Sequence, residues 1–219
     1  MNKTKKIEEL SLVDRLVGLL RDAIINGEIE PGAHIGIKNI SDAYGVSMIP
    51  VREALARLLA SRLVRVENNR GYFVADRPTP DKFRQFIEAR ELFECSVIGM
   101  GFDNATPADI KKLRGLNEKM GKVAASQRKD RMVKWSALNV EFHQVLVGLA
   151  RNSYLSNQYA DLSFGNMHFQ LVRSLPKEFT SLEQLVGEHD QMIEALEAGD
   201  RDRFFAVLSA HIRNIMIEE

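Results

Sequence analysis

The chain has 219 residues, of which 45% are hydrophobic and 27% are charged, with 30 Lys and Arg against 30 Asp and Glu. This length predicts two small domains with buried cores, and the zero net charge lends no support of its own to nucleic-acid binding. The single cysteine excludes an intrachain disulfide, and the sequence shows no secretory or membrane-spanning apolar run. We therefore expect a cytoplasmic protein with no membrane partner.

The first predicted elements are an amphipathic helix and a short second helix. Apolar pairs recur at helical spacing over residues 12–25 and stop at Asn26-Gly27, after which Glu30-Pro31-Gly32 predicts a turn. Apolar positions within residues 37–44 predict the second helix. Gly45 falls where a residue in the left-handed conformation would close it.

A third helix is predicted to begin at Ser47, whose hydroxyl would cap it, with Pro50 in the first turn. Its apolar stripe is Val51, Leu55, Leu58 and Leu59. The side chains left off this stripe are Met48, Ile49, Arg52 and Arg57. Two short helices, a tight glycine turn and an arginine near the start of the second suit insertion into a DNA major groove.

Two β-prone runs follow, residues 63–66 and 71–74, joined by a polar and partly basic tip at residues 67–70. This pattern predicts a hairpin, which would be the wing of a winged helix-turn-helix spanning residues 1–76. DNA affinity would then depend on a local basic cluster. Its members are Lys38, Arg52, Arg62, Arg65 and Arg70.

The second half of the chain predicts helices only, so we expect a mostly α fold. Two prolines stiffen a linker at residues 77–80, and residues 81–219 form an all-α bundle of about six helices. The predicted spans are 81–101, 107–126, 130–149, 153–174, 181–198 and 201–217.

Histidines on three of these helices could form a metal site. His143 shares a helix face with Asn139 four residues earlier, and His189 and His211 lie on the last two helices. Three imidazoles with an oxygen ligand suit a divalent transition metal, although spacing alone also fits ordinary buried histidines. Arg90 lies near an apolar face, where it could pair with Glu94 at i+4 or bind a carboxylate ligand.

The N-terminal part resembles the GntR family of bacterial transcription regulators. The matching residues are Asn26-Gly27, Pro31-Gly32, Val46-Ser47, residues 50–55, Leu58, Asn69-Arg70-Gly71 and Val74. The DNA contacts implied by the motif and the resemblance are Lys38, Ser47, Met48, Ile49, Arg52, Arg57, Asn69, Arg70 and Gly71. The family usually has an arginine where this chain has Met48, so the operator preference does not carry over; Met48 either contacts a thymine methyl or omits a phosphate contact.

Residues 80–219 resemble the helical ligand-binding domain of the FCD (FadR-type) subgroup. The matching stretches are residues 89–94, Phe142-His143, Asn152, Leu155, Glu188-His189, Ile193, Ala195-Leu196, Gly199-Asp200 and His211-Ile212. In many members the three histidines and an aspartate hold zinc or nickel, and a small carboxylate completes the coordination sphere. Asn139 stands here in place of that aspartate. The resemblance implies an effector contact for Arg90, and Arg173 is a lesser candidate for a second one.

These observations predict a homodimeric transcriptional regulator that binds a pseudo-palindromic operator and is switched by a small carboxylate bound at a metal. One alternative is a metal-dependent enzyme fused to a DNA-binding domain. No general base is evident for it, since Glu188 and Asp190 are expected to point away from the histidines. The other alternative is a constitutive regulator with a vestigial pocket, of which Asn139 would be the first sign.

Overall fold

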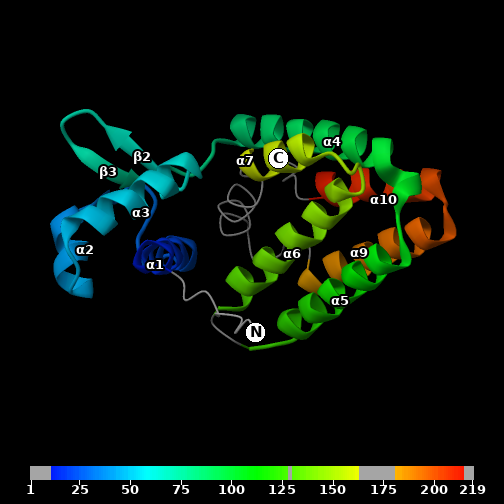
Figure 1. Cartoon of the computed structure of the whole chain (residues 1–219), viewed down its shortest axis with the longest axis horizontal. Coiled ribbons are helices and arrows are strands. Elements are labelled where there is room, and N and C mark those ends of the chain that lie inside the picture. The colour runs from blue at the N-terminus through cyan, green and yellow to red at the C-terminus, as the bar shows by residue number, and fades with distance from the viewer. Residues whose placement is uncertain (1–10, 128–129, 163–180, 215–219) are drawn as a thin grey trace, which may run out of the picture. The chain divides into compact units, whose positions relative to one another are not determined.

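The computed structural model describes residues 11–127, 130–162 and 181–214, and the chain divides into two compact units between Asp76 and Arg77 (Figure 1). Each unit has its own hydrophobic core.

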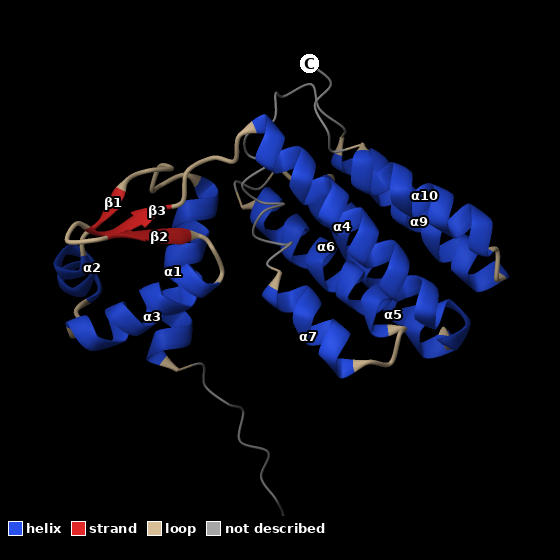
Figure 2. Cartoon of the chain, turned by 90° about the horizontal axis from the view of Figure 1, so that it is seen from above, coloured by secondary structure: helices blue, strands red, loops and turns tan. Residues whose placement is uncertain are grey.

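The N-terminal unit combines three helices with a small antiparallel sheet. In chain order its elements are α1 (Leu12–Asn26), β1 (His34–Ile35), α2 (Ile37–Tyr44), α3 (Met48–Ala60), β2 (Val64–Glu67) and β3 (Gly71–Val74). The strands, red in Figure 2, have the order β1-β3-β2, with Val64 opposite Val74 in the hairpin. The predicted winged helix-turn-helix is confirmed. The sequence did not predict β1, which is only two residues long.

The helix-turn-helix consists of α2, Gly45 and α3. Gly45 has a φ of 62°, in the left-handed region that favours glycine, and its N–H donates to the carbonyl oxygen of Ser41. Ser47 stands at the N-cap of α3, but its side chain makes no capping hydrogen bond within the described residues. The prediction of a hydroxyl cap was therefore wrong, while the helix start itself is where the sequence placed it.

One face of α3 lies in the core of this unit. Val51, Ala54, Leu55 and Leu58 are buried at the i, i+3, i+4, i+7 spacing of a helix that covers a core. Leu59, predicted to belong to this stripe, is 39% exposed because it lies at the edge of the buried face, whereas Ala54, which was not predicted to belong to it, is buried.

Leu55→Ala is expected to lower the free energy of unfolding of this unit by about 2–5 kcal/mol, since it removes a fully buried side chain and leaves a cavity. Ile49→Ala, on the same helix at 77% exposure, is the matched control and should leave stability nearly unchanged. Urea denaturation followed by circular dichroism measures both. Equal losses in the two variants would contradict the assigned faces of α3.

The C-terminal unit is helical throughout its described residues. Its elements are α4 (Pro80–Gly101), the 3-10 turn η1 (Phe102–Asn104), α5 (Pro107–Ala124), α6 (Arg131–Gly148), α7 (Ser153–Asp161), α9 (Leu182–Ala198) and α10 (Arg201–Arg213). The helix starts are within one residue of those predicted. The C-terminal part of the predicted 153–174 helix lies outside the described residues, as do residues 215–217. Pro80 begins α4 and Thr79 caps it, so the last residue of the predicted linker belongs to the helix.

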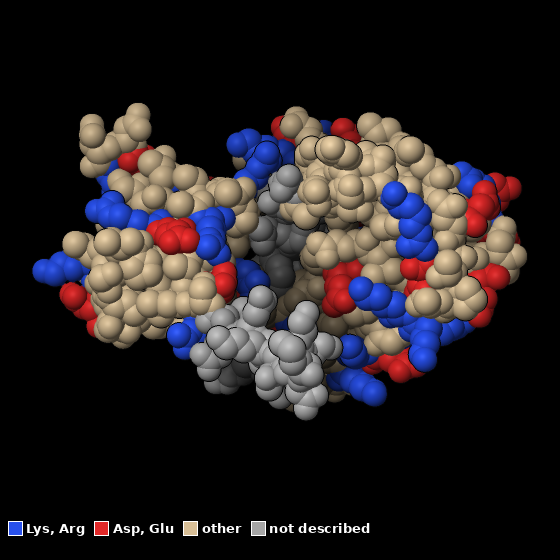
Figure 3. Space-filling view, viewed as in Figure 1, with Lys and Arg blue, Asp and Glu red and all other residues tan. Residues whose placement is uncertain are grey.

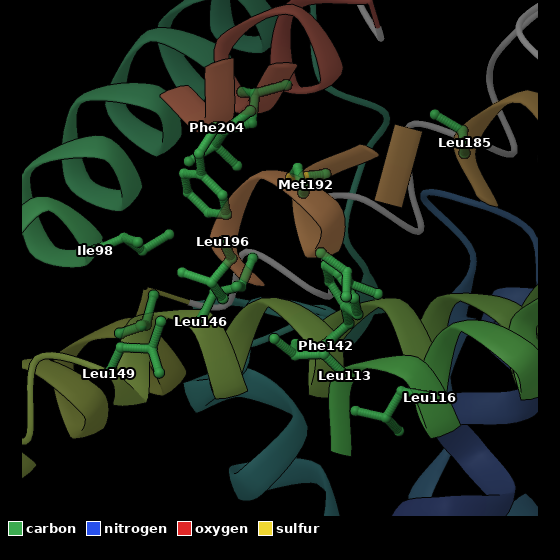
Figure 4. Packing of buried hydrophobic residues seen from close by; sticks show 14 of the residues in the cluster. Ile98, Leu113, Leu116, Phe142, Leu146, Leu149, Leu185, Met192, Leu196 and Phe204 are labelled. Carbon is green, nitrogen blue, oxygen red and sulfur yellow. The ribbon is translucent and has the colours of Figure 1, made fainter. Parts of the chain in front are cut away.

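Apolar side chains from α4, α5, α6, α9 and α10 meet in one core, in which Phe142, Met192 and Phe204 are fully buried (Figure 4). Gly101, at the end of α4, lies against the backbone that follows α6. A Cβ atom there would come within 2.2 Å of the carbonyl group of Leu149, so this close approach requires glycine. No described helix is long and apolar enough to cross a membrane.

Candidate metal centre and DNA-recognition surface

Three buried histidines from three helices meet inside the C-terminal unit. His143 comes from α6, His189 from α9 and His211 from α10, and one ring nitrogen from each lies within 4.8 Å of the others. The Nε2 atom of His211 lies 3.3 Å from Nε2 of His143 and 3.3 Å from Nε2 of His189. The structure thus brings together the three histidines that the sequence singled out.

In each histidine, the ring nitrogen Nδ1 lies within hydrogen-bonding distance of a side-chain oxygen, while Nε2 faces the other rings. His143 Nδ1 lies 2.7 Å from Glu94 Oε2, and His211 Nδ1 lies 2.7 Å from Glu188 Oε2. His189 Nδ1 lies 3.2 Å from Oδ1 of Asn117. The Asn117 amide nitrogen donates to Asp190 and to a backbone carbonyl, so its oxygen is the atom left to accept.

This pattern fixes the tautomer of the rings. A carboxylate or amide oxygen can only accept, so each neutral ring carries its proton on Nδ1 and directs the lone pair of Nε2 inward. The lone pair of His211 Nε2 then faces those of His143 and His189 at 3.3 Å each, and these lone pairs repel unless a positive group lies among them. Histidines oriented by hydrogen bonds at the far nitrogen are typical of metal ligands.

The nearest positive group among the described residues is Arg90 on α4. Its Nη2 lies 3.1 Å from His143 Nε2, and its Nε donates to Glu94 Oε1 at 2.7 Å. Tyr159 on α7 donates to the same carboxylate oxygen at 2.9 Å. Of the two roles that the sequence left open for Arg90, the structure shows the pairing with Glu94, and the guanidinium also lies against His143. Binding of a carboxylate by Arg90 stays a prediction.

Burial and charge set the protonation of this cluster. Burial lowers the pKa of His143 to about 4, although Glu94 favours the charged ring, and burial also lowers the pKa of His211. Burial alone would raise the pKa of Glu94, but Arg90 and His143 hold it well below its usual range. At neutral pH, His143 and His211 are therefore neutral and Glu94 is ionised.

Acidification is expected to destabilise the metal-free helical unit. The pKa of His143 is about 4 when folded against 6.5 for an ordinary histidine, so the unfolded chain takes up more protons between these values. The stabilising contribution is complete above pH 6.5 and is lost as the pH falls toward 4. Between about pH 7.5 and about pH 5 this ring accounts for a loss on the order of 2 kcal/mol.

Urea denaturation of chelator-treated protein at the two pH values measures this loss. His143→Gln should show a shallower pH dependence because it removes the titrating ring. Equal slopes in the two proteins would contradict the lowered pKa of His143.

Asn139 lies on the face of α6 that carries His143, four residues earlier, and is buried. Its Oδ1 has no hydrogen-bond partner within the described residues, and neither has the buried hydroxyl of Ser136, one turn before it. Buried polar atoms are rarely left unpaired, so these two oxygens are available to accept from, or to coordinate, a bound group.

Sequence reasoning missed the residues that orient the histidines. Glu188 was expected to point away from the histidines, and this was wrong: its carboxylate contacts His211, which lies one helix later. Glu94 was considered only as a partner of Arg90, and Asn117 and Tyr159 were not considered. A carboxylate or amide that reaches a histidine from a different helix carries no local signal in the sequence. Arg173 lies outside the described residues.

The predicted DNA contacts lie on α2, α3 and the wing. Lys38, Ser47, Met48, Ile49 and Arg52 are exposed, and among the described residues no ion pair involves Arg52. Arg57 instead forms ion pairs with Asp14 at 2.7 Å and with Glu53 at 2.8 Å, so its charge is neutralised by acidic residues of the same unit.

In the wing, Asn69 and Gly71 adopt left-handed conformations at the turn, and Arg70 pairs with Glu67 and covers the ring of Phe73. On the face shown in Figure 3, basic and acidic side chains are interspersed on both units rather than gathered into one patch. Because the whole chain has 30 basic and 30 acidic residues, we expect DNA affinity to come from particular contacts rather than from a strong overall field.

A winged helix-turn-helix with an exposed start of its second helix, in a chain with a separate helical domain, defines a DNA-binding transcriptional regulator. Residues 12–74 match the family described as bacterial regulatory proteins, gntR family, and residues 85–214 match the FCD domain. The chain belongs to the GntR family, with an FCD domain as its C-terminal unit.

Relatives align over nearly the whole chain. The HTH-type transcriptional regulator LutR of Bacillus subtilis is 25% identical over 210 residues, covering 88% of this chain and 94% of that protein. The HTH-type transcriptional repressor GlaR of Escherichia coli is 25% identical over 199 residues, covering 88% and 89%. These relatives are transcriptional regulators and not enzymes, in agreement with the family to which this chain belongs.

Solved structures share the fold. A putative GntR transcriptional regulator from Rhodococcus sp. RHA1 superposes with a TM-score of 0.70 at 26% identity, covering 93% of this chain and 95% of that one. McbR/YncC of E. coli gives a TM-score of 0.72 at 20% identity, with 94% and 95% covered, which shows the fold alone.

Proposed function

We propose that this regulator holds a divalent transition metal, zinc or nickel, at His143, His189 and His211, and that a small carboxylate bound there switches its affinity for DNA. The observation that supports this most directly is the convergence of one ring nitrogen from each histidine. Each ring is oriented by a hydrogen bond at its Nδ1 atom. Imidazole nitrogens suit both metals. When bound, the metal supplies a positive centre for an anionic ligand, and Asn139 offers a neutral oxygen beside it.

Arg90 is the proposed second contact for the carboxylate. Its guanidinium is buried, is fixed by Glu94 and already reaches the edge of the histidine cluster. A planar guanidinium pairs well with a carboxylate, which would explain why a positive charge is kept at this depth.

On DNA, we propose a homodimer in the cytoplasm that places two α3 helices in successive major grooves of a pseudo-palindromic operator. Lys38 and the wing would contact phosphates and set the register, and Arg52 would contact a base edge, most often guanine. A ligand shifts operator affinity only if it binds one arrangement of the protein more tightly than another.

The test begins with the metal content of untagged protein, purified without added metal, by inductively coupled plasma mass spectrometry. About one equivalent of zinc or nickel per chain is expected. Small carboxylates are then screened by thermal shift and added to an operator titration. Protein that stays empty after metal addition, and that no carboxylate stabilises, would overturn the proposal and favour a constitutive regulator with a vestigial pocket.

A further inference from the structure

We propose that in this regulator the carboxylate supplies the negative charge that Asn139 lacks, so that metal and carboxylate each bind tightly only in the presence of the other. This inference rests on the proposed function. It states in addition that the affinity of the site for each of the two ligands depends on the presence of the other.

The donors that face the centre carry no charge. Among the described residues, the three histidines form a ligand group that no aspartate, glutamate or cysteine joins. Glu94 and Glu188 touch the histidines, but at Nδ1, on the opposite side of each ring from the centre. The protein ligands in direct contact with a metal bound here would thus be neutral nitrogen atoms.

A positive charge is already present at the edge of the centre. The Arg90 side chain is 3% exposed and its Nη2 lies 3.1 Å from the Nε2 of His143, the atom that a metal would use. Glu94 balances that guanidinium and, being buried with it, is not left over to balance a second cation. Positive charges repel strongly where water is excluded, so Arg90 opposes metal uptake on its own.

Asn139 is the position at which a negative charge could have offset this repulsion. It is buried on the same face of α6 as His143, and its Oδ1 has no partner in the described structure. The amide offers a donor atom without a charge. A carboxylate from solution would bring the missing charge to the metal and could at the same time accept from Arg90, freeing His143 Nε2 from its contact with the guanidinium.

Coupling of this kind is reciprocal: the factor by which the carboxylate strengthens metal binding equals the factor by which the metal strengthens carboxylate binding. Cooperation between sites commonly amounts to roughly 5- to 150-fold in affinity. In a buried site that holds two cations and has no anion facing them, the coupling should exceed the lower end of that range, so we expect at least about tenfold.

The experiment measures Zn²⁺ and Ni²⁺ affinity of the full chain by competition with a chromophoric chelator. It is run in sodium chloride, in sodium acetate and in sodium malonate at equal ionic strength, with corrections for metal held by the salts. For the natural chain, at least one carboxylate should tighten metal binding by about tenfold or more over chloride. Calorimetric titration of that carboxylate, with and without metal, should return the same factor.

Asn139→Asp is the decisive variant, since it places the charge in the protein. It should bind metal about tenfold more tightly than the natural chain in chloride and gain less from carboxylate. Asn157→Asp, the same change at an exposed position of α7, should behave like the natural chain. Circular dichroism verifies folding, and the salt comparison on the natural chain tests the inference should Asn139→Asp not fold.

The outcomes separate this inference from the proposed function. Equal metal affinity in chloride and in both carboxylates, with tight binding throughout, would overturn the mutual dependence of the two ligands and leave the metal site intact. Absence of metal binding in every salt, in the natural chain and in Asn139→Asp, would overturn the metal site itself and the inference with it.

Discussion

Replacing Arg52 with alanine is expected to abolish specific operator binding while leaving the fold intact. Arg52 is exposed near the start of α3 and forms no ion pair among the described residues, so its loss leaves no buried group unsatisfied. A bidentate contact to a base is worth about 1–3 kcal/mol, and the proposed homodimer would make this contact twice. Operator affinity should therefore fall by roughly 30-fold to more than 10⁴-fold.

The measurement uses duplexes selected from a random pool with the natural protein, followed by gel-shift titration at one fixed salt concentration, because phosphate contacts make affinity depend on salt. Arg203→Ala, a surface arginine of α10 in the other unit, is the matched control and should bind as the natural protein does. Unchanged operator affinity in Arg52→Ala would contradict the prediction that α3 recognises bases through Arg52.

His189→Ala is expected to lose bound metal and carboxylate response while it keeps DNA binding. The ring supplies one of three converging nitrogens and stacks on Phe142 at a centroid distance of 4.2 Å, so no neighbour can replace it. A metal concentration one hundred times the dissociation constant stabilises a folded protein by about 2.7 kcal/mol. The variant should lack this stabilisation. For a unit of this size, that corresponds to a melting temperature lower by roughly 5–15 °C.

Mass spectrometric metal analysis and thermal shift with and without added Zn²⁺ measure the two effects. His34→Ala, an exposed histidine of the winged unit, is the control and should retain its metal. His189→Gln is a second variant that removes the imidazole but leaves a smaller cavity in the core than alanine does. A full metal load in either variant at His189 would refute the site.

Much of the N-terminal unit could be predicted because its signals are local. The left-handed glycine after α2, the proline in the first turn of α3 and the short β-prone runs each act within a few residues of where they stand. The sequence did not determine how far the buried face of α3 extends, because packing against the other elements sets its edges. Leu59, predicted to be buried, lies at one edge and is 39% exposed, whereas Ala54 is buried.

For the candidate site, the sequence by itself determined which groups are available: the three histidines, Arg90, and Asn139 in place of an acid. It also determined that Asn139 and His143 share a face, since four residues make about one helical turn. Only the tertiary structure decided that the three rings meet and which oxygen holds each one, because those partners are 23 to 72 residues apart. Contacts over such separations follow from the packing of whole helices around a common core, and that packing also turned Glu188 toward a histidine.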